Sequence, residues 1–346
     1  IVSIELGMND VNGANPDSKE APAEYIAGMK KLADNVRAIS AQPLFISSSP
    51  VNDGSLMDSW ASVRCRAIHI FTDALLELGQ KENVQVVDQY HPLINLWGSN
   101  LIMEHAGILA AIARGLKPEN KIPEMEALQA FAKAWKGQPA GIPLGGDPVH
   151  PALVGQYTMA ATILTALNVD REVSSATIKP DGTVVATKYC KITDVVAKDG
   201  KLSFTRLDER SPWPLPPFSA PPALKLMPGI ADLSLYTLTI PGLPVGQYRV
   251  AMNDQVVATL SHEALEKGWN MSTVLEGKGP LGKRANTIEP LIGELQNPLN
   301  NAWRAASKEK NPEKLAAAQK AIEECEAKVQ AACQPEPIRF AIEPVQ

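Results

Sequence analysis

The stretch Gly145-Gly146-Asp147-Pro148-Val149-His150-Pro151 places an acid three residues before a histidine, between two glycines and two prolines. The glycines can adopt backbone angles that a Cβ would forbid, and the prolines fix φ and exclude helix, so we expect a stiff loop. The residues that follow have helical spacing. A rigid loop ahead of a helix can hold Nδ1 of His150 against the Asp147 carboxylate and leave Nε2 to accept a proton, as a general base requires.

A second candidate loop follows the short apolar run Ile1–Leu6, which predicts a strand. This strand delivers Gly7-Met8-Asn9-Asp10 into a loop at its carboxyl end. In open α/β sheets that end is where ligands bind. We therefore take Gly7, Asn9 and Asp10 as further candidate site residues.

Strands and helices are predicted to alternate at short intervals between the two loops. The expected elements are a helix over 25–39, strand 43–47, a helix over about 55–78, strand 84–87 and a helix over 154–167. This alternation predicts the α/β class, a parallel sheet covered by helices. Residues 90–144 carry two helical stretches, 100–114 and 123–135, which we interpret as a helical insertion over the site.

The composition changes near Asn168, and length alone suggests about two domains. We expect a domain at 1–169 and a smaller β-rich region with C-terminal helices at 170–346. Short β-type runs from 175 to 258, separated by Asp-Gly, Pro-Gly and Asn-Asp turns, predict a small antiparallel sheet or sandwich. Helical segments at 286–308 and 312–333 suit an antiparallel pair, and the tail reads as a strand returning to the sheet.

Charge and hydropathy argue against several classes of partner. The chain has 33 basic and 38 acidic residues, a net charge of −5, and no basic block, so nucleic acid and anionic membrane surfaces are unsuitable partners. No apolar run approaches the roughly 20 residues that a transmembrane helix needs. Four scattered cysteines are too few for a disulfide framework. Because Ile1 opens inside an apolar run, we expect an N-terminal piece, with any signal peptide, to precede it.

Two short motifs carry a family resemblance. GluLeuGlyMetAsnAsp at 5–10 and GlyGlyAspProValHisPro at 145–151 resemble the third and fifth sequence blocks of the SGNH hydrolases, the GDSL esterase/lipase superfamily. The order of the two motifs, their separation and their positions after a strand and in a loop agree with the family pattern. The resemblance covers roughly residues 1–169. It implies a flavodoxin-like, three-layer α/β/α parallel sheet. Residues 238–271 more vaguely resemble the accessory C-terminal part of some secreted bacterial members.

The resemblance implies a role for each candidate residue. His150 would be the general base toward a serine and then the acid toward the leaving alcohol, and Asp147 would orient its imidazole. Asn9 would donate to the oxyanion, a contact worth about 10² to 10³ in rate. Gly7 and Asp10 would lie beside it, with Gly7 giving backbone clearance. From the residues alone, Asn9 can instead cap a strand-end turn, and Asp147 can be an Asx-turn acceptor.

One departure from the family pattern is large. The family's nucleophile lies in a Gly-Asp-Ser block after the first strand, and a second oxyanion donor is a glycine in the next block. Neither block is found in residues 1–346, and both are expected to precede Ile1. Ser3 and Ser47–Ser49 do not match the pattern. We therefore expect this chain alone to be inactive and the intact protein to be the enzyme.

The function implied is hydrolysis of a carboxylic ester through a serine acyl-enzyme, with no metal or organic cofactor. Family analogy suggests a small-molecule or carbohydrate ester, such as an acetylated sugar, as substrate, and a secreted or periplasmic protein. The alternative is a non-catalytic glycan-binding or scaffold protein that retained the fold.

The other histidines receive no catalytic role from the sequence. They are His69, His91, His105 and His262, and no pair has the spacing of a zinc motif, so no metal site is predicted. His91 and Trp97 follow the strand at 84–87, and we expect that they could line the site.

Overall fold

The computed structural model describes residues 1–51, 62–120, 122–213, 220–274 and 279–345. The start of the helix expected from about residue 55 lies outside them. The chain divides into two compact units: Ile1–Val169 with Pro222–Ile230, and Asp170–Pro221 with Ala231–Gln346. The short segment 222–230, which the sequence analysis placed in the second region, thus belongs to the first unit.

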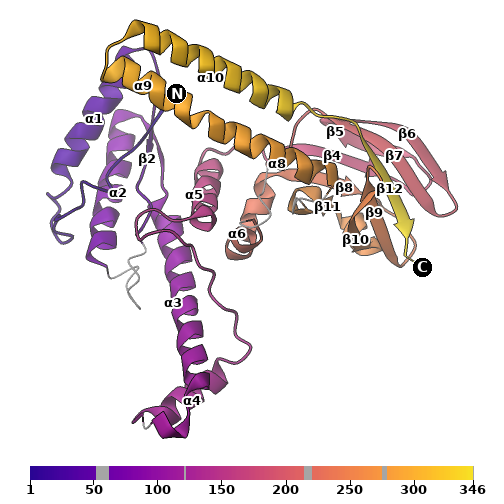
Figure 1. Cartoon of the computed structure of the whole chain (residues 1–346), viewed down its shortest axis with the longest axis horizontal. Helices are drawn as coiled ribbons and strands as arrows, with labels where there is room; N and C mark the ends of the chain where they lie inside the picture. Colours follow the sequence, from indigo (N-terminus) through magenta and orange to yellow (C-terminus); the bar gives the residue numbers. More distant parts are fainter. Residues whose placement is uncertain (52–61, 121, 214–219, 275–278, 346) are drawn as a thin grey trace. The chain divides into compact units, whose positions relative to one another are not determined.

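The first unit is built on a parallel sheet of three strands in the order β1-β2-β3 (Figure 1). These are β1 (Val2–Glu5), β2 (Pro43–Ile46) and β3 (Gln85–Val87). All four residues of β2 are buried, as expected for a central strand covered on both faces. The mixed α/β class expected from the alternating pattern is found.

Helices pack on both faces of this sheet. Phe45 points into a core shared with α1 (Ala23–Ala38) and α2 (Val63–Glu82). Its neighbours Leu44 and Ile46 pack instead against Ile163 and Leu167, at the end of α5 (Leu153–Ala166). Because successive side chains of a strand point to opposite faces, this split places α1 and α2 on one face and α5 on the other.

The insertion after β3 is helical, but its first helix begins earlier than expected. Helix α3 (Tyr90–Gly115) starts ten residues before the predicted Asn100. Pro92 stands in its first turn, where a missing backbone N–H removes no helical hydrogen bond. A short 3₁₀ turn η1 (Pro118–Asn120) leads to α4 (Met125–Ala134), which packs at the far end of α3 (Figure 1).

The second unit contains two β-sheets, ordered β10-β9-β12-β7-β6 and β11-β8-β4-β5. Their strands are β4 (Glu172–Ile178), β5 (Val184–Lys188), β6 (Cys190–Lys198), β7 (Lys201–Asp208), β8 (Leu235–Thr239), β9 (Gln247–Met252), β10 (Gln255–Ser261), β11 (Trp269–Asn270) and β12 (Ile338–Pro344). The returning strand β12 pairs antiparallel with β7 and β9, as expected. The expectation of purely antiparallel pairing is wrong for β4 and β8, which run parallel.

The remaining helical elements begin with α6 (Ala220–Leu226), η2 (Pro228–Leu233), α7 (His262–Lys267) and η3 (Met271–Val274). They end with α8 (Gly279–Glu294), α9 (Gln296–Ser307) and α10 (Pro312–Cys333). The single helix expected over 286–308 is therefore divided between α8 and α9. Pro298 lies in the first turn of α9, where its missing backbone N–H removes no helical hydrogen bond, and Pro290 lies inside α8. Helices α9 and α10 run alongside each other, as expected (Figure 1).

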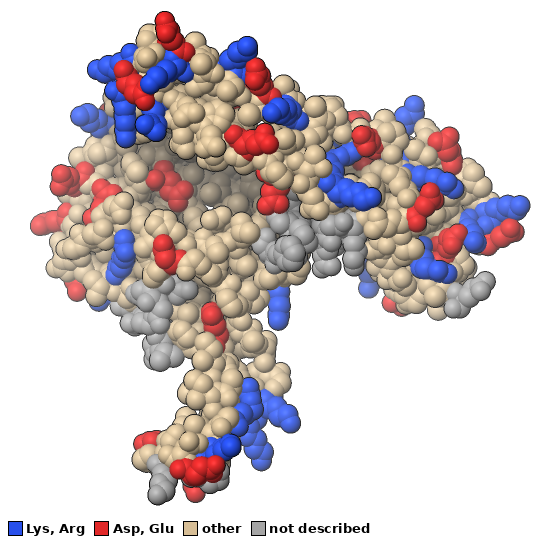
Figure 2. Space-filling view, in the orientation of Figure 1, with Lys and Arg blue, Asp and Glu red and all other residues tan. Residues whose placement is uncertain are grey.

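Three whole-chain features bear on function. Among the described residues, no helix is both long enough and apolar enough to cross a membrane. None of the four cysteines, all of which the structure describes, forms a disulfide. On the face shown in Figure 2, basic and acidic side chains are interspersed over the described residues and form no continuous basic surface.

The second unit is anchored by a buried ionic network. Arg206 is fully buried, and its Nε donates to Asp208 Oδ1 at 2.8 Å. Its other nitrogens donate to Ser174 Oγ at 2.8 Å and to the Thr237 carbonyl at 2.9 Å. The Tyr236 hydroxyl donates to the second Asp208 oxygen. A guanidinium without water around it requires such partners, so the network ties β4, β7 and β8 together.

Replacing Asp208 with alanine leaves the Arg206 charge buried without its carboxylate. We expect Asp208→Ala to lower the free energy of unfolding of the second unit by about 3–5 kcal/mol. Urea unfolding followed by tryptophan fluorescence measures this loss. Glu324→Ala is the control, because that side chain is 64% exposed in its pair with Lys320 on helix α10 and its removal should cost under about 1 kcal/mol. Equal losses in the two variants would contradict the account of the network.

Candidate active site

The loop ahead of α5 is closed by its own backbone. Gly146 and Pro151 form an antiparallel bridge, and the Ala152 N–H donates to the Gly145 carbonyl at 3.1 Å. Both glycines have positive φ, +67° and +79°. A Cβ on Gly146 would lie 2.0 Å from the His150 carbonyl oxygen, so this position accepts only glycine.

The Asp147 carboxylate accepts three hydrogen bonds from within this turn. Its Oδ1 accepts the backbone N–H groups of Val149 at 2.8 Å and of His150 at 2.7 Å. Its Oδ2 lies 2.9 Å from Nδ1 of His150. The carboxylate therefore acts as an Asx-turn acceptor and also orients the imidazole, so the two interpretations left open by the sequence hold together.

These contacts stabilise the charged form of Asp147. The His150 side chain, followed by the backbone N–H groups of His150 and Val149, lowers the pKa of Asp147 from 3.8 to about 2. Because an ionised carboxylate only accepts, Nδ1 of His150 carries the proton of the shared hydrogen bond. The Nε2 lone pair of a neutral His150 then points away from Asp147. With a side chain 81% exposed, this nitrogen is accessible to a reactant.

The loop after β1 presents Asn9 next to a constrained glycine. Gly7 is buried at φ +119°, and a Cβ there would lie 3.1 Å from Ser48 Oγ. The adjoining Leu6 carbonyl accepts from the hydroxyls of Tyr25 and Ser48, both at 3.2 Å. Asn9 is exposed, and its side chain has no hydrogen bond to any residue that the structure describes. Its amide N–H groups are thus available to a ligand.

Both candidate loops border the same hydrophobic core. Met8, from the loop after β1, and Val149, from the loop before α5, pack against the cluster that contains Ile4 and Phe45. Each loop thus contacts this core through one apolar side chain. Asp10 is exposed at the end of the first loop.

The serines after β2 are buried, and two of them form hydrogen bonds with neighbouring backbone groups. Ser47, Ser48 and Ser49 are buried. Ser47 Oγ accepts the Gln89 N–H at 2.9 Å and also the Tyr90 N–H at 3.3 Å. The Ser48 hydroxyl donates to the Leu6 carbonyl at 3.2 Å. Ser47 Oγ thus accepts two backbone N–H groups, and the Ser48 hydroxyl donates its proton to a carbonyl.

Trp97 does not line the site, which corrects the expectation from its position after β3. Its side chain is only 3% exposed, and Nε1 donates to Thr158 Oγ1 at 3.0 Å. The indole fixes α3 to α5 and is part of a small core with Leu93 and Leu144.

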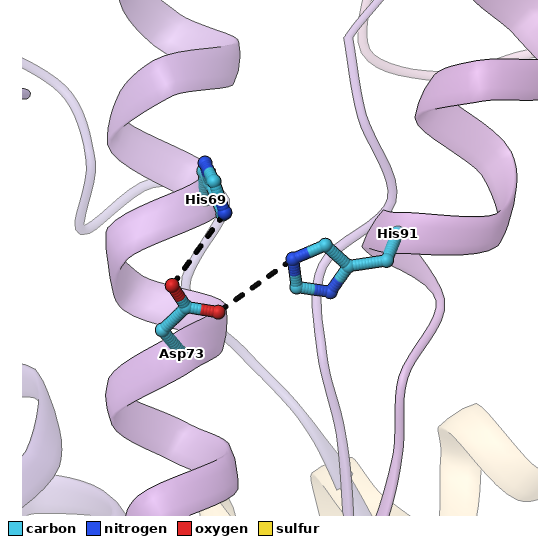
Figure 3. A group of neighbouring side chains, drawn as sticks. All are labelled: His69, Asp73 and His91. Carbon is cyan, nitrogen blue, oxygen red and sulfur yellow. Dashed lines mark ion pairs between the residues drawn. The ribbon is translucent and has the colours of Figure 1, made fainter.

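A group of three side chains, two on α2 and one at the start of α3, was not predicted from the sequence. His91 and His69 both direct Nε2 at the carboxylate of Asp73, at 3.6 Å and 3.5 Å (Figure 3). His69 and Asp73 are four residues apart on α2, a spacing that places both on one helix face. That spacing was visible in the sequence. The contribution of His91 was not, because only the fold brings it to α2.

Comparison with known proteins supports the fold. A solved structure described as a gut microbial diltiazem-metabolizing enzyme matches this chain with a TM-score of 0.71 at 16% sequence identity. The match covers 99% of this chain and 83% of the other. No protein-family model and no curated protein sequence matches. The likeness therefore concerns the architecture: a mixed α/β unit followed by a β-rich region.

The lowered pKa of Asp147 gives a direct test of the loop geometry. We expect the Asp147 carboxyl carbon to titrate near pH 2 in an NMR titration, and His150→Ala to move the midpoint toward 3.8. Since the folded pKa is lowered, the loop's electrostatic stabilisation is present above pH 3.8 and is lost as pH falls through about 2. An unchanged midpoint in the variant would contradict the hydrogen bond to Nδ1.

Proposed function

We propose that this chain carries the general-base and oxyanion parts of the active site of an SGNH-type serine ester hydrolase. The observation that carries the proposal is the Asp147–His150 turn. A carboxylate fixed by two backbone N–H groups holds Nδ1 of the imidazole at 2.9 Å and leaves the opposite nitrogen exposed. This is the arrangement that a histidine needs to remove a proton from a serine hydroxyl.

The residues of this arrangement have a defined role in each step of acyl transfer. His150 Nε2 accepts the proton as the serine oxygen attacks the ester carbonyl, and the imidazolium formed is stabilised by Asp147. The proton then passes to the departing alcohol, which leaves an acyl-enzyme. A water molecule, deprotonated by the same nitrogen, attacks the acyl carbon; the bond to the serine oxygen breaks, the acid leaves, and the imidazolium returns its proton to the serine. Asn9 donates its side-chain N–H to the negative oxygen of both tetrahedral intermediates.

The serine is proposed to come from a Gly-Asp-Ser block outside residues 1–346. The family pattern places that block before the Gly7–Asp10 loop. The burial of Ser47, Ser48 and Ser49 supports a nucleophile located elsewhere. Gly7 and Asp10 are proposed to shape the oxyanion side of the site.

A small acyl ester, such as an acetylated sugar, is the proposed substrate, and family analogy suggests a secreted or periplasmic location. The structural relative is described as a diltiazem-metabolizing enzyme, and a hydrolytic function for this chain is compatible with that description. No step of the proposed mechanism uses a metal or an organic cofactor.

Hydrolysis of p-nitrophenyl acetate by the full-length protein, extended before Ile1, tests the proposal. We expect His150→Ala to lower the rate by on the order of 10³, since general base catalysis is worth about 10² to 10⁴. Asn9→Ala should lower it by about 10² to 10³. His262→Ala is the matched control, because this histidine belongs to the second unit and should leave the rate unchanged.

The possible outcomes separate the alternatives. Residues 1–346 alone should give no turnover, and turnover that His150→Ala abolishes would show that the serine lies within this chain. A full-length protein as inert as its His150→Ala variant would contradict the ester hydrolase and favour the non-catalytic glycan-binding alternative.

A further inference from the structure

Three side chains from two helices converge at the edge of the first unit, as Figure 3 shows. Helix α2 presents His69 and Asp73 on one face, and the first turn of α3 contributes His91. Nε2 of His69 lies 3.5 Å from one Asp73 oxygen, and Nε2 of His91 lies 3.6 Å from the other. One ligand atom from each of the three residues lies within 4.8 Å of the other two.

A second layer of contacts holds His91 in place. Nδ1 of His91 lies 2.7 Å from Asp88 Oδ2, and the other Asp88 oxygen accepts the His91 backbone N–H at 3.1 Å. Asp88 therefore fixes both the position of the residue and the orientation of its ring. A carboxylate behind the distal nitrogen of a histidine is the usual support of a metal-ligating imidazole.

His69 is positioned by its neighbours in the same region. Its ring stacks on that of Tyr90, with centroids 5.5 Å apart and planes inclined by 16°. Tyr90 is 4% exposed and belongs to the core, so this support is firm. The ring of His69 also meets His91 edge-on, with a centroid distance of 5.1 Å.

Nε2 of His91 and the Asp73 carboxylate face each other, and this pair of groups is better suited to binding a cation than to contacting each other. With Asp88 accepting from Nδ1, a neutral His91 presents a lone pair at Nε2, and the Asp73 carboxylate offers only lone pairs. Two acceptors that face each other repel, whereas a positive ion between them is attracted to both. Ligand atoms bound 2.0–2.1 Å from a tetrahedral zinc ion are about 3.3 Å apart. The distances of 3.5 Å and 3.6 Å, which run from the two imidazoles to different oxygens of Asp73, are within a few tenths of an ångström of that value, and the three ligand atoms lie within 4.8 Å of one another.

We propose that His69, Asp73 and His91 bind a divalent transition-metal ion of the zinc class, with Asp88 orienting His91. Two imidazoles and one carboxylate select such ions over Mg²⁺ and Ca²⁺, which prefer oxygen ligands. The three side chains are 38–54% exposed, so water completes the coordination. The ion links α2 to the start of α3, immediately after β3, and it is independent of the Asp147–His150 turn.

Zinc titration of the chain by isothermal calorimetry tests the site. We expect one Zn²⁺ per chain and a transition temperature that rises with Zn²⁺, because an ion bound by the folded state stabilises it. His69→Ala and His91→Ala should each weaken binding by at least about 100-fold, and Asp88→Asn by about 10- to 100-fold, the range for an outer partner of a ligand. Co²⁺ bound to the unaltered chain should give tetrahedral visible absorption that both histidine variants lose.

Two controls address adventitious binding to exposed histidines. His150→Ala removes the other exposed histidine paired with a carboxylate, and His262→Ala removes one in the second unit. Both should leave the zinc affinity unchanged. Absence of binding up to about 1 mM Zn²⁺ would overturn the proposal. Equal affinity of the unaltered chain and the His69→Ala/His91→Ala double variant would also overturn it. Because the readout is metal affinity, neither result depends on ester hydrolysis.

Discussion

The candidate site depends on one carboxylate, which accepts hydrogen bonds from the N–H groups of its own turn. Asp147 accepts two backbone N–H groups and the Nδ1 proton of His150, all from the residues that follow it within the same short loop. The turn therefore forms without help from distant elements, and its geometry is local. The requirement for glycine at Gly146 follows from the same closure, since its Cβ would collide with the His150 carbonyl. Local closure allows an 81% exposed imidazole to keep a defined orientation.

The second candidate loop follows a strand of the parallel sheet and packs against the same core as the turn. β1 ends at Glu5 and leads into the Gly7–Asp10 loop, where the side-chain amide of Asn9 has no hydrogen bond to any of the residues described. Helix α5, which follows the loop containing His150, packs on Leu44 and Ile46 of the sheet. The loop containing His150 and the loop containing Asn9 thus both pack against one hydrophobic cluster, although their residues are far apart in the sequence.

Features encoded by neighbouring residues were predictable, and features created by long-range packing were not. The Asp147–His150 turn and β2 followed from local residue types and alternation. The early start of α3 was not predicted; Pro92 occupies a first-turn position of that helix. Parallel pairing of β4 with β8 depends on a crossover that periodicity does not report. His91 meets His69 only because β3 places the start of α3 beside α2, so spacing alone could not reveal the cluster.

The central claim is that His150 activates a serine for covalent chemistry. Reaction of the full-length protein with a fluorophosphonate, followed by mass spectrometry of its peptides, tests it most directly. The account predicts one adduct, on a serine of a Gly-Asp-Ser block outside residues 1–346, and its loss in His150→Ala. An adduct that forms equally well in His150→Ala, or no adduct on any serine, would contradict it.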